Sequence, residues 1–513
     1  NVVDQMRYDL LYRFWEDLGD DGFKKLVREG FSCENTHFNY TPTFTGPGHT
    51  SIYTGTTPSM HGIISNDWYN YEEDSVIYCV NDKGVKSVGT ASSSGQKSPK
   101  WLLTTTLADE LELATNGRSK TIGISLKDRS SIMPMGRAGD GAYWFEGAKE
   151  GNWVTSSWYN ETLPSWVTQF NDRKLCDGYL EKVWELSASE DTYDESLPDN
   201  NPYENGFTGH LKPTFPYDLK AMAEANGTYD LMKITPWGNE LTIEMAKAAI
   251  IGEEMGVDDI PDLLALSFSA FDYVGHKFGP TSREAQDMLL VLDKQLADFI
   301  NFLDDQIGKN EYLIFLTADH GAVHVPSYLK SLQIAAEYWK PANMVEDVKA
   351  MLATKYGQGR WVLSYNDDQF YLNRKLITEQ KLNLRTMQVE IRDFVMNYTG
   401  VKEVYTADDL ARFEYTTSMR GVVQNGYNHR RSGDVFILTE PGWLKYSTFT
   451  GTHHGSPYAY DTHVPLLFYG WGIKAGQSHK LVNITDLAPT ISGLLHIQMP
   501  NGTTGQMIDE VFH

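Results

Sequence analysis

The sequence predicts an α/β protein with a doubly wound, mostly parallel central sheet and helices on both faces. Short apolar runs alternate with helical patterns over most of the chain, which is typical of a parallel sheet covered by helices. The length of 513 residues exceeds one ordinary core, and two long regions depart from the alternation. We therefore expect one large α/β core that carries inserted subdomains.

Five short apolar runs are the candidate strands of the central sheet. Strands that are buried on both faces read as continuous apolar runs of this kind. They are Val2–Asp4, Thr121–Ser125, Leu263–Phe268, Tyr312–Thr317 and Leu466–Tyr469.

Two helices are expected next to these strands. Apolar residues recur at spacings of three and four over Arg283–Asp304, which predicts the clearest helix of the chain. The segment Gly279-Pro280-Thr281-Ser282 before it supplies a proline and a capping hydroxyl, which mark its start. A second helix is expected over Leu241–Met255. It precedes the strand at Leu263, so the chain returns from this helix to the central sheet.

Two regions predict insertions into this core. Residues 130–235 are rich in Trp, Tyr, Asn, Gly and Pro, which indicates a loop-rich insertion rather than sheet scaffold. Residues 330–450 combine apolar runs at Val362 and Val435 with a helical pattern near Glu379–Tyr398, which predicts a small α+β subdomain. The α/β core is then made of residues 1–129, 236–329 and 451–513.

Composition excludes several classes of protein. The net charge of −24 and the absence of a Lys or Arg run argue against a nucleic-acid partner. No run of about 18 apolar residues is present, so no transmembrane segment is expected. Cys33, Cys79 and Cys176 allow at most one disulfide and form no C-x-x-C site. Residue 1 directly precedes an apparent strand, so we expect the natural N-terminus, with any signal peptide, to have been removed.

Carboxylate and imidazole groups lie at or near the ends of several predicted strands. Asp272 and His276 are four residues apart, which brings both side chains to one side of a helical turn. Asp319 and His320 follow a strand whose carboxyl end is where ligands gather in open parallel sheets. Together these groups can bind two Zn²⁺-like cations side by side, as hydrolysis of a phosphate ester requires. The candidate ligands are Asp4, Asp272, His276, Asp319, His320 and His454.

Each acidic and histidine pair alone is also compatible with a solvated Asp and a surface histidine. Their joint occurrence after several strands favours the metal site. The other histidines have no acidic or strand-end partner of this kind, and a hydrogen-bonded structural role is expected for each. These are His37, His49, His61, His210, His324 and His463.

Thr45 is a candidate nucleophile. It precedes the turn Gly46-Pro47-Gly48 and an apparent helix that begins at His49 or Thr50. A threonine alcohol is a weak nucleophile, but a metal ion can bind and deprotonate it, and helix N-terminal amides can steady a phosphate. Taken alone, Thr45 reads as a turn residue, and several nearby threonines could serve as well.

The stretch from Thr45 to Gly55, with His61–Tyr69 after it, resembles the alkaline phosphatase superfamily. It most resembles the phosphate-insensitive, PafA-type alkaline phosphatases, which use threonine. The resemblance covers nearly the whole chain. It extends over Val2–Arg7, Asp272, Asp319–Gly321, His454–Ser456 and Thr485–Thr490.

This resemblance implies an alkaline-phosphatase-like fold with two Zn²⁺ per chain. One zinc would be held by Asp272, His276 and His454, and the other by Asp4, Thr45, Asp319 and His320. His454 directly precedes Gly455 and fits the family pattern, so His453 is the expected bystander. An additional structural Ca²⁺ or Mg²⁺ in one of the insertions is left open.

Lys127 and Arg129 favour a monoester over a diester. They follow the strand Thr121–Ser125 and share a face if the backbone is extended, and they resemble the paired Lys/Arg of the PafA-type enzymes. A monoester presents three nonbridging oxygens, so extra cationic donors favour it. Asn66 resembles the amide that donates to a phosphoryl oxygen. The C/S-x-P-x-R segment of sulfatases is absent from the nucleophile region.

The expected function is a metal-dependent alkaline phosphatase that hydrolyses small phosphate monoesters through a phosphothreonine intermediate. The alternatives are a nucleotide pyrophosphatase/phosphodiesterase of the same superfamily and a non-catalytic, metal-stabilised binding protein. The resemblance implies a periplasmic or secreted enzyme, and we expect a monomer with residues 130–235 over the active site. The physiological ester is not predicted.

Overall fold

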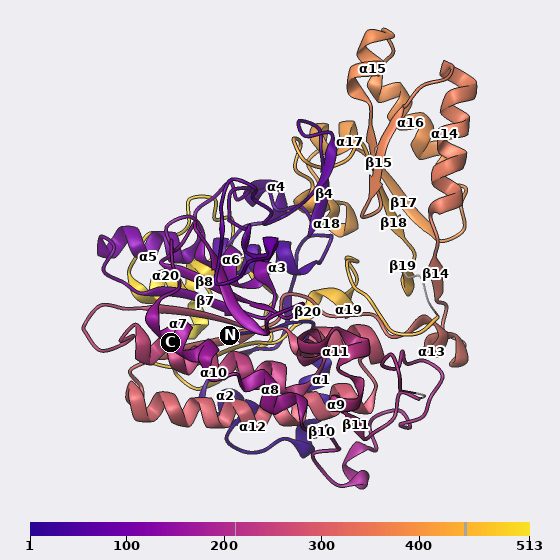
Figure 1. Ribbon diagram of the computed structural model, residues 1–513. Coiled ribbons are helices and arrows are strands. Elements are labelled where there is room, and N and C mark those ends of the chain that lie inside the picture. Colours follow the sequence, from indigo (N-terminus) through magenta and orange to yellow (C-terminus); the bar gives the residue numbers. More distant parts are fainter. Residues whose placement is uncertain (211, 446–448, 513) are drawn as a thin grey trace.

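A ten-stranded sheet forms the centre of the protein in a computed structural model that describes residues 1–513 except 211, 446–448 and 513 (Figure 1). In spatial order its strands are β22 (Gly476–Ser478), β2 (Phe31–Cys33), β21 (Leu466–Gly470), β13 (Leu313–Thr317), β1 (Val2–Val3), β12 (Leu263–Phe268), β7 (Thr121–Ser125), β8 (Gly141–Glu146), β9 (Asn152–Ser156) and β6 (Ser87–Val88). All five predicted strands belong to this sheet.

The centre of the sheet is parallel, and antiparallel pairs flank it on both sides, although the edge strand β22 pairs with β2 in parallel. Strands β13, β1, β12, β7 and β8 pair in parallel, with Val2 opposite both Ser267 and Thr317. The doubly wound, mostly parallel sheet is therefore confirmed. One predicted core strand differs, because β21 runs antiparallel to β13 and to β2. Its apolar run reads the same in either direction, so the sequence pattern does not reveal its orientation.

Helices cover both faces of this sheet (Figure 1). On one side lie α10 (Pro236–Gly252) and α12 (Arg283–Gln306), and on the other lie α5 (Leu107–Thr115) and α6 (Asp128–Met135). Helix α12 begins as predicted, with the Ser282 hydroxyl accepting from the Ala285 amide at 3.1 Å. Helix α10 begins earlier than expected because Pro236 fits the first turn of a helix.

The expected loop-rich insertion at residues 130–235 needs correction in its first part. Strands β8 and β9 lie in this range and extend the central sheet. Every residue of β8 is buried, so its Tyr and Trp, which had suggested irregular structure, are core residues. Short elements follow, among them α7 (Ser165–Asp172), α8 (Leu175–Leu180) and a pair of two-residue strands. Residue 211 lies outside the described residues.

A smaller α+β unit falls within residues 330–450, orange at the top of Figure 1. Its antiparallel sheet has the order β15-β16-β18-β17, and a hydrophobic cluster separate from the main core holds it together. Its main elements are α14 (Ala342–Tyr356), β15 (Val362–Asn366), β16 (Gln369–Leu372), α16 (Leu384–Val395), β17 (Val401–Thr406) and β18 (Val435–Thr439). The exact domain boundaries stay a prediction, and residues 446–448 lie outside the described part.

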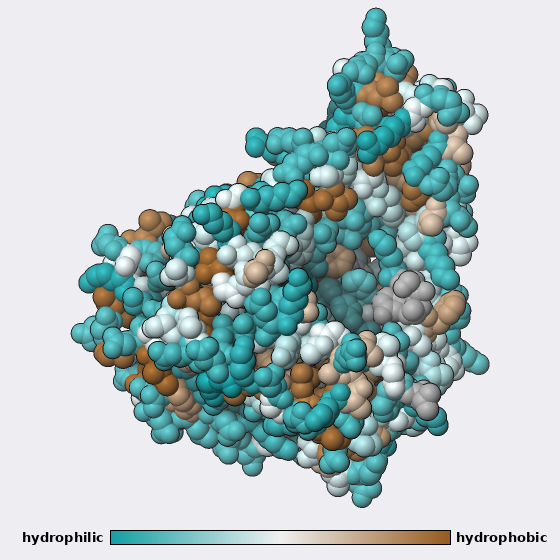
Figure 2. Space-filling view, in the orientation of Figure 1, coloured by the Kyte–Doolittle hydropathy of each residue, from teal (hydrophilic) through white to brown (hydrophobic). Residues whose placement is uncertain are grey.

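A hollow opens where this unit meets the main body (Figure 2). Residues from both parts line a cavity of about 170 Å³ there. The three cysteines are free and buried. None of the helices in the described part of the chain combines the length and apolar character needed to cross a bilayer.

Candidate active site

The candidate metal ligands gather at the carboxyl ends of the three central strands. Asp4 follows β1, Asp319 and His320 follow β13, and Asp272 lies on α11 (Ala270–Phe278), directly after β12. Because these strands are adjacent and parallel, the residues after them meet at one edge of the sheet.

One ligand group consists of Asp4, Asp319 and His320, whose ligand atoms lie within 4.8 Å of one another. His320 Nε2 is 3.5 Å from Asp4 Oδ1 and 3.5 Å from Asp319 Oδ2. The Thr45 hydroxyl lies 3.4 Å from the same nitrogen. The four residues expected around one zinc are therefore next to one another.

The second ligand group is the one expected around the other zinc, namely Asp272, His276 and His454. Asp272 and His454 also lie close enough to His320 to share an ion with it. Asp272 Oδ1 is 3.2 Å from His276 Nε2 and 3.8 Å from His454 Nε2. The His320 and His454 rings stack with their centroids 3.4 Å apart, so the two groups adjoin. His453, the expected bystander, is close enough to His276 and His454 to share an ion with them.

These residues fit divalent cations. Asp4, Asp272 and Asp319 are buried together, with Lys127 in contact with two of them. Among the described residues, Asp4 Oδ1 and Asp319 Oδ2 are buried without a hydrogen-bond partner. Burial and the neighbouring carboxylate raise the pKa of Asp4 well above its ordinary value, and burial raises the pKa of Asp319 to about 7. Bound cations would offset this concentration of negative charge.

Backbone carbonyls fix the orientation of the three candidate histidine ligands. In each ring Nδ1 lies within hydrogen-bonding distance of a carbonyl oxygen, which can only accept, so Nε2 is left to face the ligand group. The distances are 2.9 Å from His276 to Thr452, 3.0 Å from His320 to Gly321 and 2.7 Å from His454 to Thr43. Burial lowers the pKa of His320 and of His454 well below the ordinary value, which keeps both rings neutral, the form in which a histidine can bind a metal ion.

The helix that carries the candidate nucleophile begins earlier than predicted. Helix α3 spans Thr45–Thr54, so Thr45 is its first residue and Gly46-Pro47-Gly48 lies in its first turn. Proline is tolerated there because the first helical amides have no partner within the helix. A Cβ at Gly48 would lie 2.4 Å from the Asp319 carbonyl oxygen, so this glycine permits close approach of the helix to the ligand loop.

Lys127 and Arg129 both face the site, but only Lys127 has the extended backbone that was predicted for both. Lys127 is the N-cap of α6 and Arg129 lies in its first turn. The Lys127 ammonium lies 2.6 Å from Asp4 Oδ2 and 2.6 Å from Asp272 Oδ2. Arg129 NH2 is 3.3 Å from the Thr45 hydroxyl.

Asn66 is oriented by the start of α3. Its side-chain oxygen accepts a hydrogen bond from the Gly46 amide at 2.8 Å. Because the oxygen is engaged there, the NH₂ group is the part of the amide that can donate to an oxygen of a bound phosphate.

Three further residues belong to the site. Gln5 donates from its backbone to Asp319 at 3.1 Å and from its side chain to Asp272 at 2.7 Å, linking the two ligand groups. In the sequence, the feature that could have pointed to Gln5 is its position directly after Asp4. Tyr78 accepts from Arg129 at 3.0 Å, and no sequence signal pointed to it.

His49 is the third, and it corrects an expectation. It lies 3.2 Å from Asp319 Oδ2, so it does have an acidic partner. Its Nε2 also lies 2.9 Å from the Ser267 hydroxyl, in keeping with a structural role. Four of the other histidines that were expected to be structural also make side-chain hydrogen bonds, namely His37, His61, His210 and His463. His324 Nδ1 is buried without a partner among the described residues.

Comparisons with known proteins decide the family. The chain matches the type I phosphodiesterase / nucleotide pyrophosphatase family over residues 2–462. The chain belongs to this family. Within the alkaline phosphatase superfamily it is similar to alkaline phosphatase PhoV of Synechococcus elongatus, with 43% identity over 99% of this chain and 92% of that protein. Alkaline phosphatase PafA of Elizabethkingia meningoseptica is 43% identical over 99% of this chain and 93% of its own length.

The crystal structure of wild-type PafA matches with a TM-score of 0.95 and 41% identity, covering 100% of this chain and 98% of that one. A crystal structure of a PafA variant with one Thr, one Asn, one Lys and one Arg substituted matches equally well. The alkaline-phosphatase-like fold is therefore confirmed, and the chain is an enzyme of the alkaline phosphatase type.

Proposed function

We propose that this enzyme is a zinc-dependent phosphomonoesterase that forms a phosphothreonine at Thr45. The observation that carries the proposal is the position of the Thr45 hydroxyl. It lies at the start of α3, 3.4 Å from His320 Nε2 and 3.3 Å from Arg129 NH2. A nucleophile there has metal ligands and a cationic oxyanion donor as direct neighbours.

Two zinc ions are the proposed cofactors. One would be held by Asp272, His276 and His454, and the other by Asp4, Thr45, Asp319 and His320. The mixed imidazole and carboxylate donor set suits zinc. Bound there, the ions supply positive charge that favours an ionised alcohol and neutralises phosphate oxygens. In the described residues every group of three or more candidate ligands lies at this edge of the sheet, so we do not extend the proposal to a Ca²⁺ or Mg²⁺ site.

The reaction proceeds by double displacement at Thr45. The Thr45 oxygen attacks phosphorus in line, a bond forms between them, and the bond to the leaving alcohol breaks. Water then attacks the phosphothreonine from the side the alcohol has left, releases phosphate and regenerates the Thr45 hydroxyl.

Three side chains bind the phosphoryl oxygens during both steps. The Asn66 NH₂ group donates to one oxygen, and Lys127 and Arg129 provide positive charge where the loose transition state concentrates negative charge. A monoester has three such oxygens for these donors, and a diester replaces one of them by an alkoxy group.

Trapping the intermediate tests this function. The enzyme is mixed with p-nitrophenyl phosphate, quenched in acid and digested, and the phosphorylated peptide is sequenced by mass spectrometry. We expect phosphate on Thr45, and none in Thr45→Ala with zinc content nearly intact. Phosphate on another residue of the wild-type enzyme would contradict the proposal.

The second candidate is a nucleotide phosphodiesterase, favoured by the description of the matching family. The cationic pair Lys127 and Arg129 argues for the monoester, because a diester has fewer charged oxygens for it. Comparing turnover of p-nitrophenyl phosphate with that of bis(p-nitrophenyl) phosphate separates the two functions.

Location and assembly are further proposals, and they rest on the family resemblance. We infer a monomer in the periplasm or outside the cell that acts on small phosphate esters. Cell fractionation and size-exclusion chromatography with light scattering test both statements.

A further inference from the structure

The β15–β16 hairpin of the smaller unit touches the loop that carries Asn66. The two strands pair Asn366 with Gln369, which leaves Asp367 and Asp368 as the loop. Both loop residues have positive φ, 45° and 56°, as the central residues of a type I′ turn do. This tight turn gives the side chains at the hairpin tip defined directions.

Two residues at the tip hold both chain neighbours of Asn66. The Ser65 hydroxyl donates a hydrogen bond to Asp367 Oδ2. The Asn366 side-chain amide donates to the Asp67 carbonyl oxygen at 2.8 Å and to Asp367 Oδ2 at 3.3 Å. Ser65 is 1% exposed, so water does not compete freely for its hydroxyl.

The main body holds Asn66 itself. Gly46 donates to its side-chain oxygen at 2.8 Å, and the Cys79 amide donates to its backbone carbonyl at 2.8 Å. The direction of the Asn66 NH₂ group therefore depends on hydrogen bonds from both parts of the protein. Loss of those at Ser65 and Asp67 would let the loop rotate this group away from its acceptor.

We propose that Asn366 and Asp367 are positioning residues that aim the Asn66 amide at the phosphoryl group, so that the smaller unit tunes monoester turnover through hydrogen bonds to this loop. The inference rests on the role proposed above for Asn66. It assigns the hairpin tip a part in catalysis without contact with the substrate.

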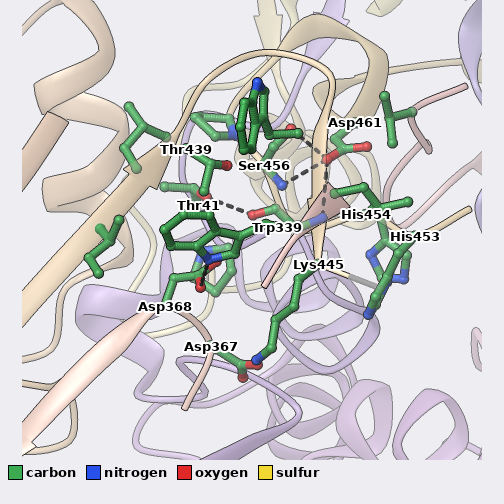
Figure 3. A pocket seen from close by; sticks show the side chains of 18 of the residues that line it. Thr41, Trp339, Asp367, Asp368, Thr439, Lys445, His453, His454, Ser456 and Asp461 are labelled. Atoms are coloured by element: carbon green, nitrogen blue, oxygen red, sulfur yellow. Dashed lines mark hydrogen bonds between the residues drawn. The ribbon is translucent and has the colours of Figure 1, made fainter. Parts of the chain in front are cut away.

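Asp368 provides a matched comparison for Asp367. It has the same charge and a similar backbone conformation, but its side chain is turned to Trp339 and away from the end of Lys445, beside which Asp367 lies (Figure 3). Asp368 Oδ1 accepts from Trp339 Nε1 at 2.9 Å and from the Tyr365 hydroxyl at 2.8 Å, both within the smaller unit. Burial raises the pKa of Asp367 to about 6, so at alkaline pH it is an ionised acceptor for Ser65.

A double-mutant cycle tests the proposal. Glycine keeps the positive φ of the turn and removes the carboxylate, so Asp367→Gly and Asp368→Gly are compared in the wild-type and Asn66→Ala backgrounds. The readouts are kcat and KM for p-nitrophenyl phosphate, with zinc content and thermal unfolding to show that each variant is folded and loaded.

We expect Asp367→Gly to lower kcat/KM by about tenfold, as for loss of one hydrogen bond to a charged acceptor, and to have no further effect once Asn66 is alanine. Asp367→Asn, which keeps an acceptor for Ser65, should recover most of the loss. Asp368→Gly should change kcat/KM less than about twofold, since its side chain accepts from Trp339 and Tyr365 and not from a neighbour of Asn66.

The outcomes separate the two proposals. If Asn66→Ala leaves monoester turnover unchanged, the role proposed for Asn66 fails and the positioning role fails with it. If Asn66→Ala slows monoester turnover, but Asp367→Gly lowers kcat/KM as much in that background as in the wild-type enzyme, only the positioning role is overturned. An equal loss in Asp368→Gly also overturns it, because the cause would then be the stability of the hairpin.

Discussion

The Nζ atom of Lys127 lies 2.6 Å from Oδ2 of Asp272, which joins a cation at the start of α6 to a candidate metal ligand on α11. The same ammonium lies 2.6 Å from Asp4, so one positive charge contacts both ligand groups. Burial acts to lower the pKa of Lys127, but Asp272 and Asp4 outweigh it and raise the pKa above its ordinary value. The ammonium therefore stays charged in the alkaline range.

Lys127→Ala should slow monoester hydrolysis by roughly 100-fold, the cost typical of removing one donor to a developing oxyanion. Hydrolysis of bis(p-nitrophenyl) phosphate should fall much less, because a diester lacks one of the charged oxygens. Lys100→Ala is the control, since its ammonium pairs with Asp82 at 3.3 Å. Equal losses on both substrates, at unchanged zinc content, would argue against a selective role for Lys127.

Gly48→Ala should destabilise the protein and reduce its zinc content. The added Cβ would lie 2.4 Å from the Asp319 carbonyl oxygen and 2.9 Å from the Asp319 Cβ, so helix and ligand loop must separate. Overpacking of this kind costs about 1–3 kcal/mol. Thermal unfolding and elemental analysis measure both effects.

Gly178→Ala is the matched control for this change. A Cβ at Gly178 in α8 meets no described atom within 4 Å, so this variant should be as stable as the wild type or slightly more so. A Gly48→Ala protein with normal stability and full zinc loading would show that the close approach is dispensable.

The central strands and the positions of several candidate metal ligands could be predicted from local sequence. Apolar runs identify β12 and β13, and Asp272 and Asp319 come shortly after these strands, whose carboxyl ends meet at one edge of a parallel sheet. The division of the candidate ligands between two zinc ions rests on the resemblance to the PafA-type enzymes and not on the strand pattern.

Other features could not be predicted because distant contacts determine them. Gly46-Pro47-Gly48 reads locally as a turn, yet the segment is helical where α3 approaches Asp319 closely. The aromatic residues of β8 read as irregular structure until the sheet buries them. Asp367 meets Ser65 across 302 residues of chain, and nothing in the hairpin sequence indicates that partner.

Asp319 should make the stability of the metal-free protein fall as the pH rises. Burial raises the pKa of Asp319 to about 7, whereas an unfolded aspartate titrates near pH 3.9 by the usual reference, about 3 units lower. The unfolded chain therefore releases this proton first, and Asp319 lowers the free energy of unfolding by up to about 1.4 kcal/mol per pH unit between the two values. The buried histidines His320 and His454, whose pKa values are lowered, act in the opposite direction. Urea unfolding of the wild-type protein and of Asp319→Asn in EDTA at pH 5 and pH 7 isolates the contribution of Asp319.

Zinc should remove or reverse that dependence, because metal binding requires the ionised carboxylate. Asp319→Asn removes the titrating group, so the change in stability in EDTA from pH 5 to pH 7 should be more positive in this variant than in the wild-type protein. An equal change in the two proteins would contradict this account of the buried carboxylate.

The adjacent histidines 453 and 454 should differ in their effect on zinc content. His454 has its Nδ1 engaged by the Thr43 carbonyl at 2.7 Å and its Nε2 directed toward Asp272, so His454→Ala should remove one of two zinc ions and most of the activity. His453 lies near His276 with a buried Nδ1 that has no partner among the described residues. His453→Ala should keep two zinc ions and most of the activity. Zinc loss in His453→Ala as large as that in His454→Ala would instead make His453 a ligand, since it is close enough to His276 and His454 to share an ion.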